Sequence, residues 1–110
     1  MQTSKTSRSE TRRANAARKA RLDIINAGVQ AEIEAFRAVI QAGTEVRAPV
    51  QRSSMMSGKR IVRAWLNSSC ELWVECADYG GWFTIGNDGT WDALLKIAGV
   101  PRDPRALGQF

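Results

Sequence analysis

The sequence predicts an α+β fold, in which a long N-terminal helix packs on a three-stranded antiparallel β-meander and a short C-terminal helix follows. Apolar residues recur every three or four positions over residues 22–40, the period of a helix, and every second position from residue 59 onward, the period of strands. The strand-like segments are short and separated by turn residues, which favours antiparallel neighbours. The 110 residues suffice for one small domain. We therefore divide the chain into a basic helical arm, residues 1–21, and a single α+β domain, residues 22–110.

The first element is a helix that we expect to begin at Ser7, because Ser7 and Glu10 fit the S-x-x-E capping box. Its apolar residues form one stripe: Leu22, Ile25, Val29, Ile33, Phe36 and Ile40. This stripe covers either the sheet of its own chain or a helix of another chain. Gly43 is expected to end the helix, and Gly28 indicates a kink or a close packing contact. The part before residue 22 has only small alanines between its basic residues and should project into solvent.

Residues 43–58 mix Gly, Pro and Ser without a period, which is typical of a linker or an irregular wrapping segment. Strand-like segments follow at residues 59–66, 70–77 and 82–86, with turns at residues 67–69 and 79–81. Alternation predicts a core face made of Val62, Ala64, Leu66, Cys70, Leu72, Val74, Cys76, Phe83 and Ile85. The opposite face is expected to carry Ile61, Arg63, Trp65, Glu71, Trp73, Glu75, Trp82 and Thr84.

The last regular element is a short helix over residues 91–98. Residues 87–89 read Asn-Asp-Gly, which indicates a turn, and Thr90 is the expected N-cap. Gly99 and Pro101 are expected to end this helix, and the tail through Phe110 should be irregular.

Charge is divided unevenly along the chain. Residues 1–21 contain seven basic residues against Glu10 alone, whereas residues 64–92 contain five acids and no base. The net charge of +5 favours an anionic partner, with nucleic acid as the first expectation and an acidic protein as the second. The expected phosphate contacts are Arg8, Arg12, Arg13, Arg18, Lys19 and Arg21, with Lys59, Arg60 and Arg63 as an extension.

Three tryptophans, Trp65, Trp73 and Trp82, fall on the face opposite the predicted core. Such a face can stack on unpaired bases or anchor a protein interface. Arg63, expected opposite Trp73, would add a cation–π contact. Glu71 and Glu75 share this face and would repel a phosphate backbone, which favours a protein partner there. Alternatively, a helix covers the face and the tryptophans form a second layer of core.

Several classes of chemistry find no support in the sequence. Histidine is absent, and there is no P-loop, dinucleotide fingerprint or zinc pattern. Asp78, Asp88 and Asp92 do not have the spacing of a calcium loop. We therefore expect no enzyme activity, no cofactor and no metal. Cys70 and Cys76 are expected to be buried thiols in a reducing cytoplasm.

The resulting hypothesis is a small, non-enzymatic, cytoplasmic nucleic-acid-binding accessory protein that binds mainly phosphates through its basic helix and is insensitive to sequence. The alternative is a phage- or plasmid-type interaction or inhibitor module that docks on a larger complex through the tryptophan-rich face. No membrane span is expected, because no apolar run approaches the required length. A homodimer is also considered, because so small a core is marginal alone.

Overall fold

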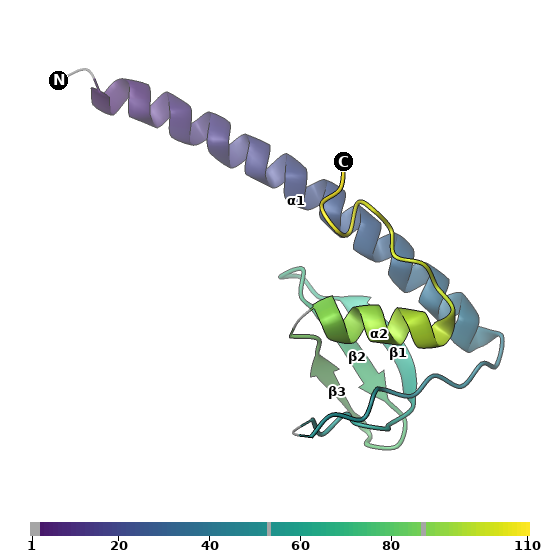
Figure 1. Cartoon of the computed structure of the whole chain (residues 1–110). Coiled ribbons are helices and arrows are strands. Elements are labelled where there is room, and N and C mark those ends of the chain that lie inside the picture. The colour runs from purple at the N-terminus through teal and green to yellow at the C-terminus, as the bar shows by residue number, and fades with distance from the viewer. Residues whose placement is uncertain (1–2, 53, 87) are drawn as a thin grey trace.

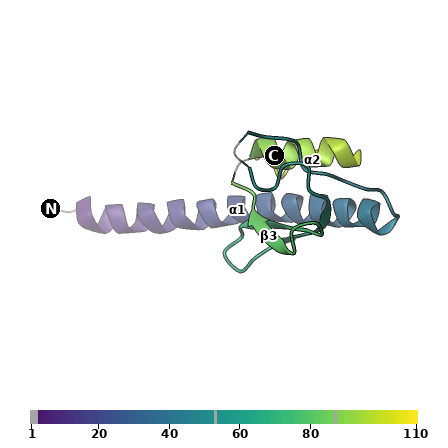
Figure 2. The same cartoon turned by 90° about the horizontal axis from the view of Figure 1, so that it is seen from below.

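The chain has the predicted α+β architecture (Figures 1 and 2). The computed structural model describes residues 3–52, 54–86 and 88–110, with side chains for all of these except 3–8 and 88. The elements are α1 (Thr3–Gln41), β1 (Ile61–Leu66), β2 (Leu72–Cys76), β3 (Gly81–Thr84) and α2 (Asp88–Ala98). The strands form one antiparallel sheet in the order β1-β2-β3, which confirms the meander. The N-terminal half of α1 projects from this body, so the molecule measures 62 × 27 × 22 Å.

Helix α1 begins earlier than predicted and ends where predicted. It starts at Thr3, so Ser7 lies inside the helix and the expected start at Ser7 is wrong. The residues before Ser7 include further Ser and Thr, which cap helices as well as Ser7 does. At the other end, Gly43 takes a φ of 94° and donates to the carbonyl of Ile40, while Thr44 donates to that of Val39. This is the Schellman pattern, for which glycine is favoured.

A β-bulge shifts the start of β1 relative to the predicted alternation. Ile61 pairs with Cys76 and Arg63 with Glu75, with a register shift between the two pairs. Ile61 is therefore buried in the core, and its expected place on the tryptophan face is wrong, while Val62 is only half-buried. From Ala64 onward the predicted alternation holds, because Ala64 is buried opposite Val74. A single extra residue was enough to change the faces locally.

The β1–β2 turn also differs from the prediction. Cys70 is exposed with a φ of 59°, so its expected place in a core-facing strand is wrong. The Asn67 side chain organises this turn, because its carbonyl oxygen accepts hydrogen bonds from the amides of Ser69 and Glu71. Asn thereby substitutes for backbone pairing in a tight turn, and β2 begins only at Leu72.

Helix α2 starts at Asp88, two residues before the predicted N-cap, so Thr90 lies within the helix and the predicted boundary is wrong. Asp and Gly suit helix starts as well as turns, so the sequence signal was ambiguous; the predicted turn residue Asn87 lies outside the described residues. The helix ends at Gly99 as expected, where Val100 donates to the carbonyl of Leu95. Leu94, Leu95 and Trp91 bury α2 on one face of the sheet.

The core gathers contributions from every segment except the arm. Ile33 and Phe36 of the predicted α1 stripe are fully buried, whereas Leu22 remains 49% exposed. The stripe thus covers its own chain in its second half. The predicted linker-like segment adds core residues too, since Val46, Ala48 and Met56 are buried and hydrogen bonds link Val46 to Ile61 and Ala48 to Lys59.

Candidate nucleic-acid interface

The basic arm is free of the body over most of its length. Every residue from 9 to 24 is exposed, and Figures 1 and 2 show this part of α1 extending beyond the sheet and α2. At about 1.5 Å per residue, positions 9–21 alone extend for about 20 Å. They include Arg12, Arg13, Arg18, Lys19 and Arg21. No side chain larger than alanine among them is apolar, so this part of the helix has nothing to bury.

The arm's cations are available to a partner. None of the described ion pairs or hydrogen bonds involves the side chains of Arg12, Arg13, Arg18 or Lys19. Arg21 is engaged, because its guanidinium lies 5.2 Å from the Phe110 ring centroid and 3.4 Å from the carbonyl of Gly108. The predicted contact Arg8 lies in α1, but its side chain lies outside the described residues.

The C-terminal tail packs against α1 at Gly28, just after the arm. After α2 the tail runs back along α1, and the C-terminus lies beside the helix (Figure 1). Gly28 is the point of closest approach: a Cβ there would come within 2.4 Å of the Ala106 nitrogen and 2.8 Å of the Arg105 Cβ. The prediction of a close packing contact at Gly28 is therefore confirmed. Only glycine lets the tail backbone lie this near the helix.

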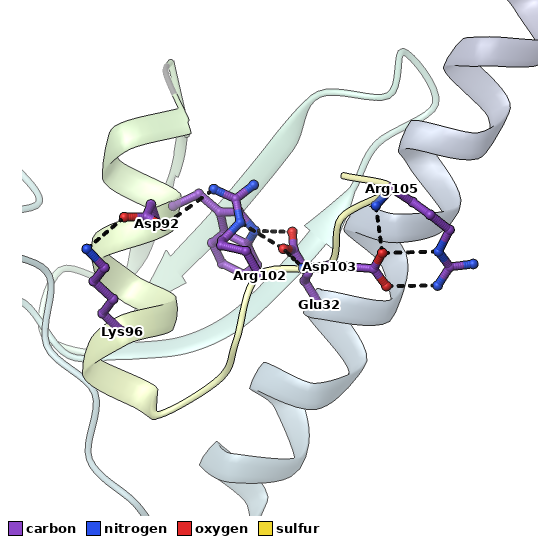
Figure 3. Close-up of polar contacts among 7 residues, drawn as sticks. Glu32, Asp92, Lys96, Arg102, Asp103 and Arg105 are labelled. Atoms are coloured by element: carbon purple, nitrogen blue, oxygen red, sulfur yellow. Dashed lines mark hydrogen bonds and ion pairs between the residues drawn. The ribbon is translucent and has the colours of Figure 1, made fainter. Parts of the chain in front are cut away.

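A buried carboxylate joins α1, α2 and the tail (Figure 3). The Glu32 carboxylate accepts hydrogen bonds from Trp91 Nε1 at 3.0 Å, Arg102 Nε at 2.8 Å and the Asp103 amide at 2.8 Å. The side chains of Glu32 and Arg102 are 1% and 13% exposed, so this ion pair is largely shielded from water. Asp103 is in turn bound by Arg105, whose hydrogen bonds lower the pKa of the Asp103 carboxyl. This network links the packed half of α1 to α2 and to the tail.

Sequence analysis missed this network, although a signal for it existed. Glu32 lies three residues after Val29 and four before Phe36, so it occupies a core-facing position of the α1 stripe. A charged residue at such a position needs a buried partner. Arg102 supplies it from 70 residues along the chain, a distance that no local pattern reveals.

The second predicted group of cations lies elsewhere and is mostly occupied. Arg60 lines a depression with Gly43 at the C-terminal end of α1, about 30 Å from Arg21 by helical rise. The Lys59 amine lies 5.4 Å from the Tyr79 ring centroid, and Arg63 lies 4.6 Å from that of Trp65. The fold therefore does not bring Lys59, Arg60 and Arg63 to the arm.

Asp78 organises the start of β1 near these cations. Its carboxylate accepts hydrogen bonds from the Arg60 amide at 3.0 Å and from Arg47 at 3.2 Å. These contacts, the amide bond foremost, lower the pKa of Asp78. In the same region, burial raises the pKa of the Cys76 thiol, which keeps it protonated and unreactive.

The tryptophan face lies opposite α2. Trp65 and Trp73 are cross-strand partners with ring centroids 6.4 Å apart and planes inclined by 17°. Arg63 pairs with Glu75, so its predicted place opposite Trp73 is wrong, and its cation–π contact is with Trp65. Trp82 is 59% exposed. Trp65 and Trp73 are half-buried, so only the Trp82 end of this face is broadly exposed.

Trp73 has an unusual feature: its indole nitrogen is buried and has no hydrogen-bond partner among the described residues. A groove of about 430 Å³ runs beside this face, lined by Arg37 of α1 and by Arg63 and Glu75 of the sheet, among others. The face thus combines exposed aromatic area with charges of both signs.

Within the described part of the chain, no three His, Cys, Asp or Glu side chains gather where they could hold a metal ion. Over the same residues, no helix has the length and apolarity needed to span a membrane. Comparisons of the chain with protein-family models, with curated proteins and with solved structures find no match. The arm and the tryptophan face are therefore interpreted on their physical chemistry.

Proposed function

We propose that this protein binds nucleic acid, without catalysis, through the exposed basic part of α1, residues 9–21. The observation that carries the proposal is that Arg12, Arg13, Arg18 and Lys19 are exposed and have no partner among the described residues. A helix that buries nothing gains little stability from its own chain. An anionic polymer gives these cations partners and removes the repulsion between neighbours such as Arg18 and Arg21.

The magnitude of the electrostatic contribution suits a binding function. Duplex DNA carries one negative charge per about 1.7 Å, so an arm of about 20 Å lies beside about 12 phosphates. Each neutralised phosphate contributes about 0.9 to the slope of log affinity against log salt. Four cations therefore account for a slope of about 3.6, and for an affinity that depends little on base sequence.

The proposal is tested with the full chain and two variants of equal charge. The arm variant changes Arg12, Arg13, Arg18 and Lys19 to Ala. The matched control changes Arg52, Lys59, Arg60 and Arg63 to Ala and removes the same charge from the body. At 0.1 M salt we expect the arm variant to bind DNA about 10³-fold more weakly than wild type, because each lost contact costs up to about eightfold there. Equal losses in both variants would show only a response to net charge and would sink the proposal.

A second candidate function is docking of a protein on the tryptophan face. It is favoured by the unpartnered indole nitrogen of Trp73 and by the exposure of Trp82, since exposed tryptophans often anchor interfaces. Trp82→Ala should abolish capture of such a partner while leaving DNA affinity unchanged, and the arm variant should do the reverse. A cytoplasmic location and a homodimer also belong to this proposal.

A further inference from the structure

We infer that the ligand of the arm is the major groove of duplex DNA, with α1 lying in the groove; this rests on the proposed nucleic-acid function. The first support is the distribution of charge around the helix. Successive residues are about 100° apart. Relative to Arg12, Lys19 lies within about 20°, Arg13 about 100° to one side and Arg18 about 120° to the other. A flat surface meets only one of the latter two, whereas a groove with two phosphate walls meets both.

The opposite side of the helix has the composition of a surface that faces away from DNA. Glu10, the single acid of residues 9–21, lies about 160° from Arg12, and Arg21 lies about 180° from it. Arg21 is held there by Phe110 and Gly108 of the tail. The acid and the tail thus fall on the side that would face solvent. Asp23 returns to the Arg12 side and limits the contact to the residues before it.

The size of the arm fits this groove. An α-helix with side chains is about 10–12 Å across, and the major groove of B-DNA is about 12 Å wide. Ala14, Ala16, Ala17 and Ala20 keep the arm slim between its cations. Arg12 and Lys19 would then lie between the two phosphate walls, and the helix would cover guanine N7, which faces this groove.

Other anionic surfaces fit less well. Single strands are usually bound by stacking on aromatic side chains, and residues 9–21 include none. Duplex RNA has a deep, narrow major groove that a helix cannot enter. A membrane-surface helix needs a broad apolar face, which residues 9–21 lack.

The test compares three full-length single variants, Arg13→Ala, Arg18→Ala and Glu10→Gln, by salt titration on duplex DNA, duplex RNA and single-stranded DNA of equal length. Arg13→Ala and Arg18→Ala should each lower the salt slope on duplex DNA by about 0.9 and weaken binding by up to about eightfold at 0.1 M salt. Glu10 lies on the solvent side, so Glu10→Gln should change neither the salt slope nor the affinity for duplex DNA by more than about twofold. Wild type should also protect guanine N7, which lies in the major groove, from methylation by dimethyl sulfate.

The possible outcomes separate failure of the proposed function from failure of the major-groove inference. No binding to any of the three polymers overturns the proposed function itself, and this inference with it. Binding to single-stranded DNA or duplex RNA as tight as to duplex DNA keeps the proposed function and overturns the groove. A salt slope that falls in only one of the two arginine variants indicates contact with a one-sided surface. Competition by a minor-groove ligand such as netropsin, without protection of guanine N7, places the arm in the minor groove. Both results overturn the inference.

Discussion

The Glu32 network makes a quantitative prediction for the stability of the fold. In a Glu32→Gln variant the amide oxygen can serve either Trp91 or the pair Arg102 and Asp103, but the NH₂ group must then face a donor on the other side. One buried donor left without an acceptor costs about 1–3 kcal/mol, and replacing the ionised acceptor by a neutral amide weakens the two remaining bonds by about 1 kcal/mol each. Asp92 lies 3.8 Å from Arg102 and keeps part of its charge compensated. We therefore expect a loss of about 3 kcal/mol in the free energy of unfolding.

Urea and thermal unfolding of wild type, Glu32→Gln and Glu34→Gln measure this loss. Glu34 is exposed on the same helix, so its variant should stay within about 0.5 kcal/mol of wild type. For a domain of this size, about 3 kcal/mol corresponds to a fall of about 12 °C in Tm. A Glu32→Gln variant within 1 kcal/mol of wild type would refute the view that this carboxylate joins the helices and the tail.

Three further predictions concern particular backbone and side-chain contacts. Gly28→Ala should destabilise the fold although Ala is the better helix former by about 1 kcal/mol, because its Cβ would meet the Ala106 nitrogen at 2.4 Å; a gain in Tm would contradict this contact. Cys70→Gly should raise the free energy of unfolding by about 0.5–1 kcal/mol by relieving the left-handed conformation, and in the wild type a thiol reagent should modify Cys70 well before Cys76. The lowered pKa of Asp78 stabilises the fold above its usual 3.8, and this contribution is lost as pH falls through the lowered value. Asp78→Asn should therefore flatten the acid side of the stability profile, and an unchanged profile would show that Asp78 does not contribute.

The sequence was sufficient for the elements whose signals are local and periodic. The stripe around Ile33 and Phe36 gave the packed half of α1, and alternation gave three strands and most of their faces. The bulge between Ile61 and Arg63 could not be predicted, because an extra residue leaves the apolar pattern plausible on either face. Helix starts were misplaced for a similar reason, since several neighbouring residues could serve as the cap.

The candidate site was predictable in composition but not in arrangement. The density of cations in residues 1–21 is visible in the sequence, and so is the absence of apolar residues to bury. Whether Lys59 and Arg60 would join them depended on the direction of α1 relative to the sheet. That direction depends on long-range contacts, among them the packing of α1 on β1, the Glu32–Arg102 pair and the approach of the tail to Gly28.

The most direct test of the central claim is an NMR titration of the full chain with duplex DNA, following backbone amides and the tryptophan indole signals. We predict that shifts concentrate in residues 9–21, while the indole signals of Trp73, Trp82 and the Glu32-bound Trp91 stay in place. Shifts confined to Trp73 and Trp82 with an unperturbed arm would contradict the account, because DNA would then be bound on the sheet.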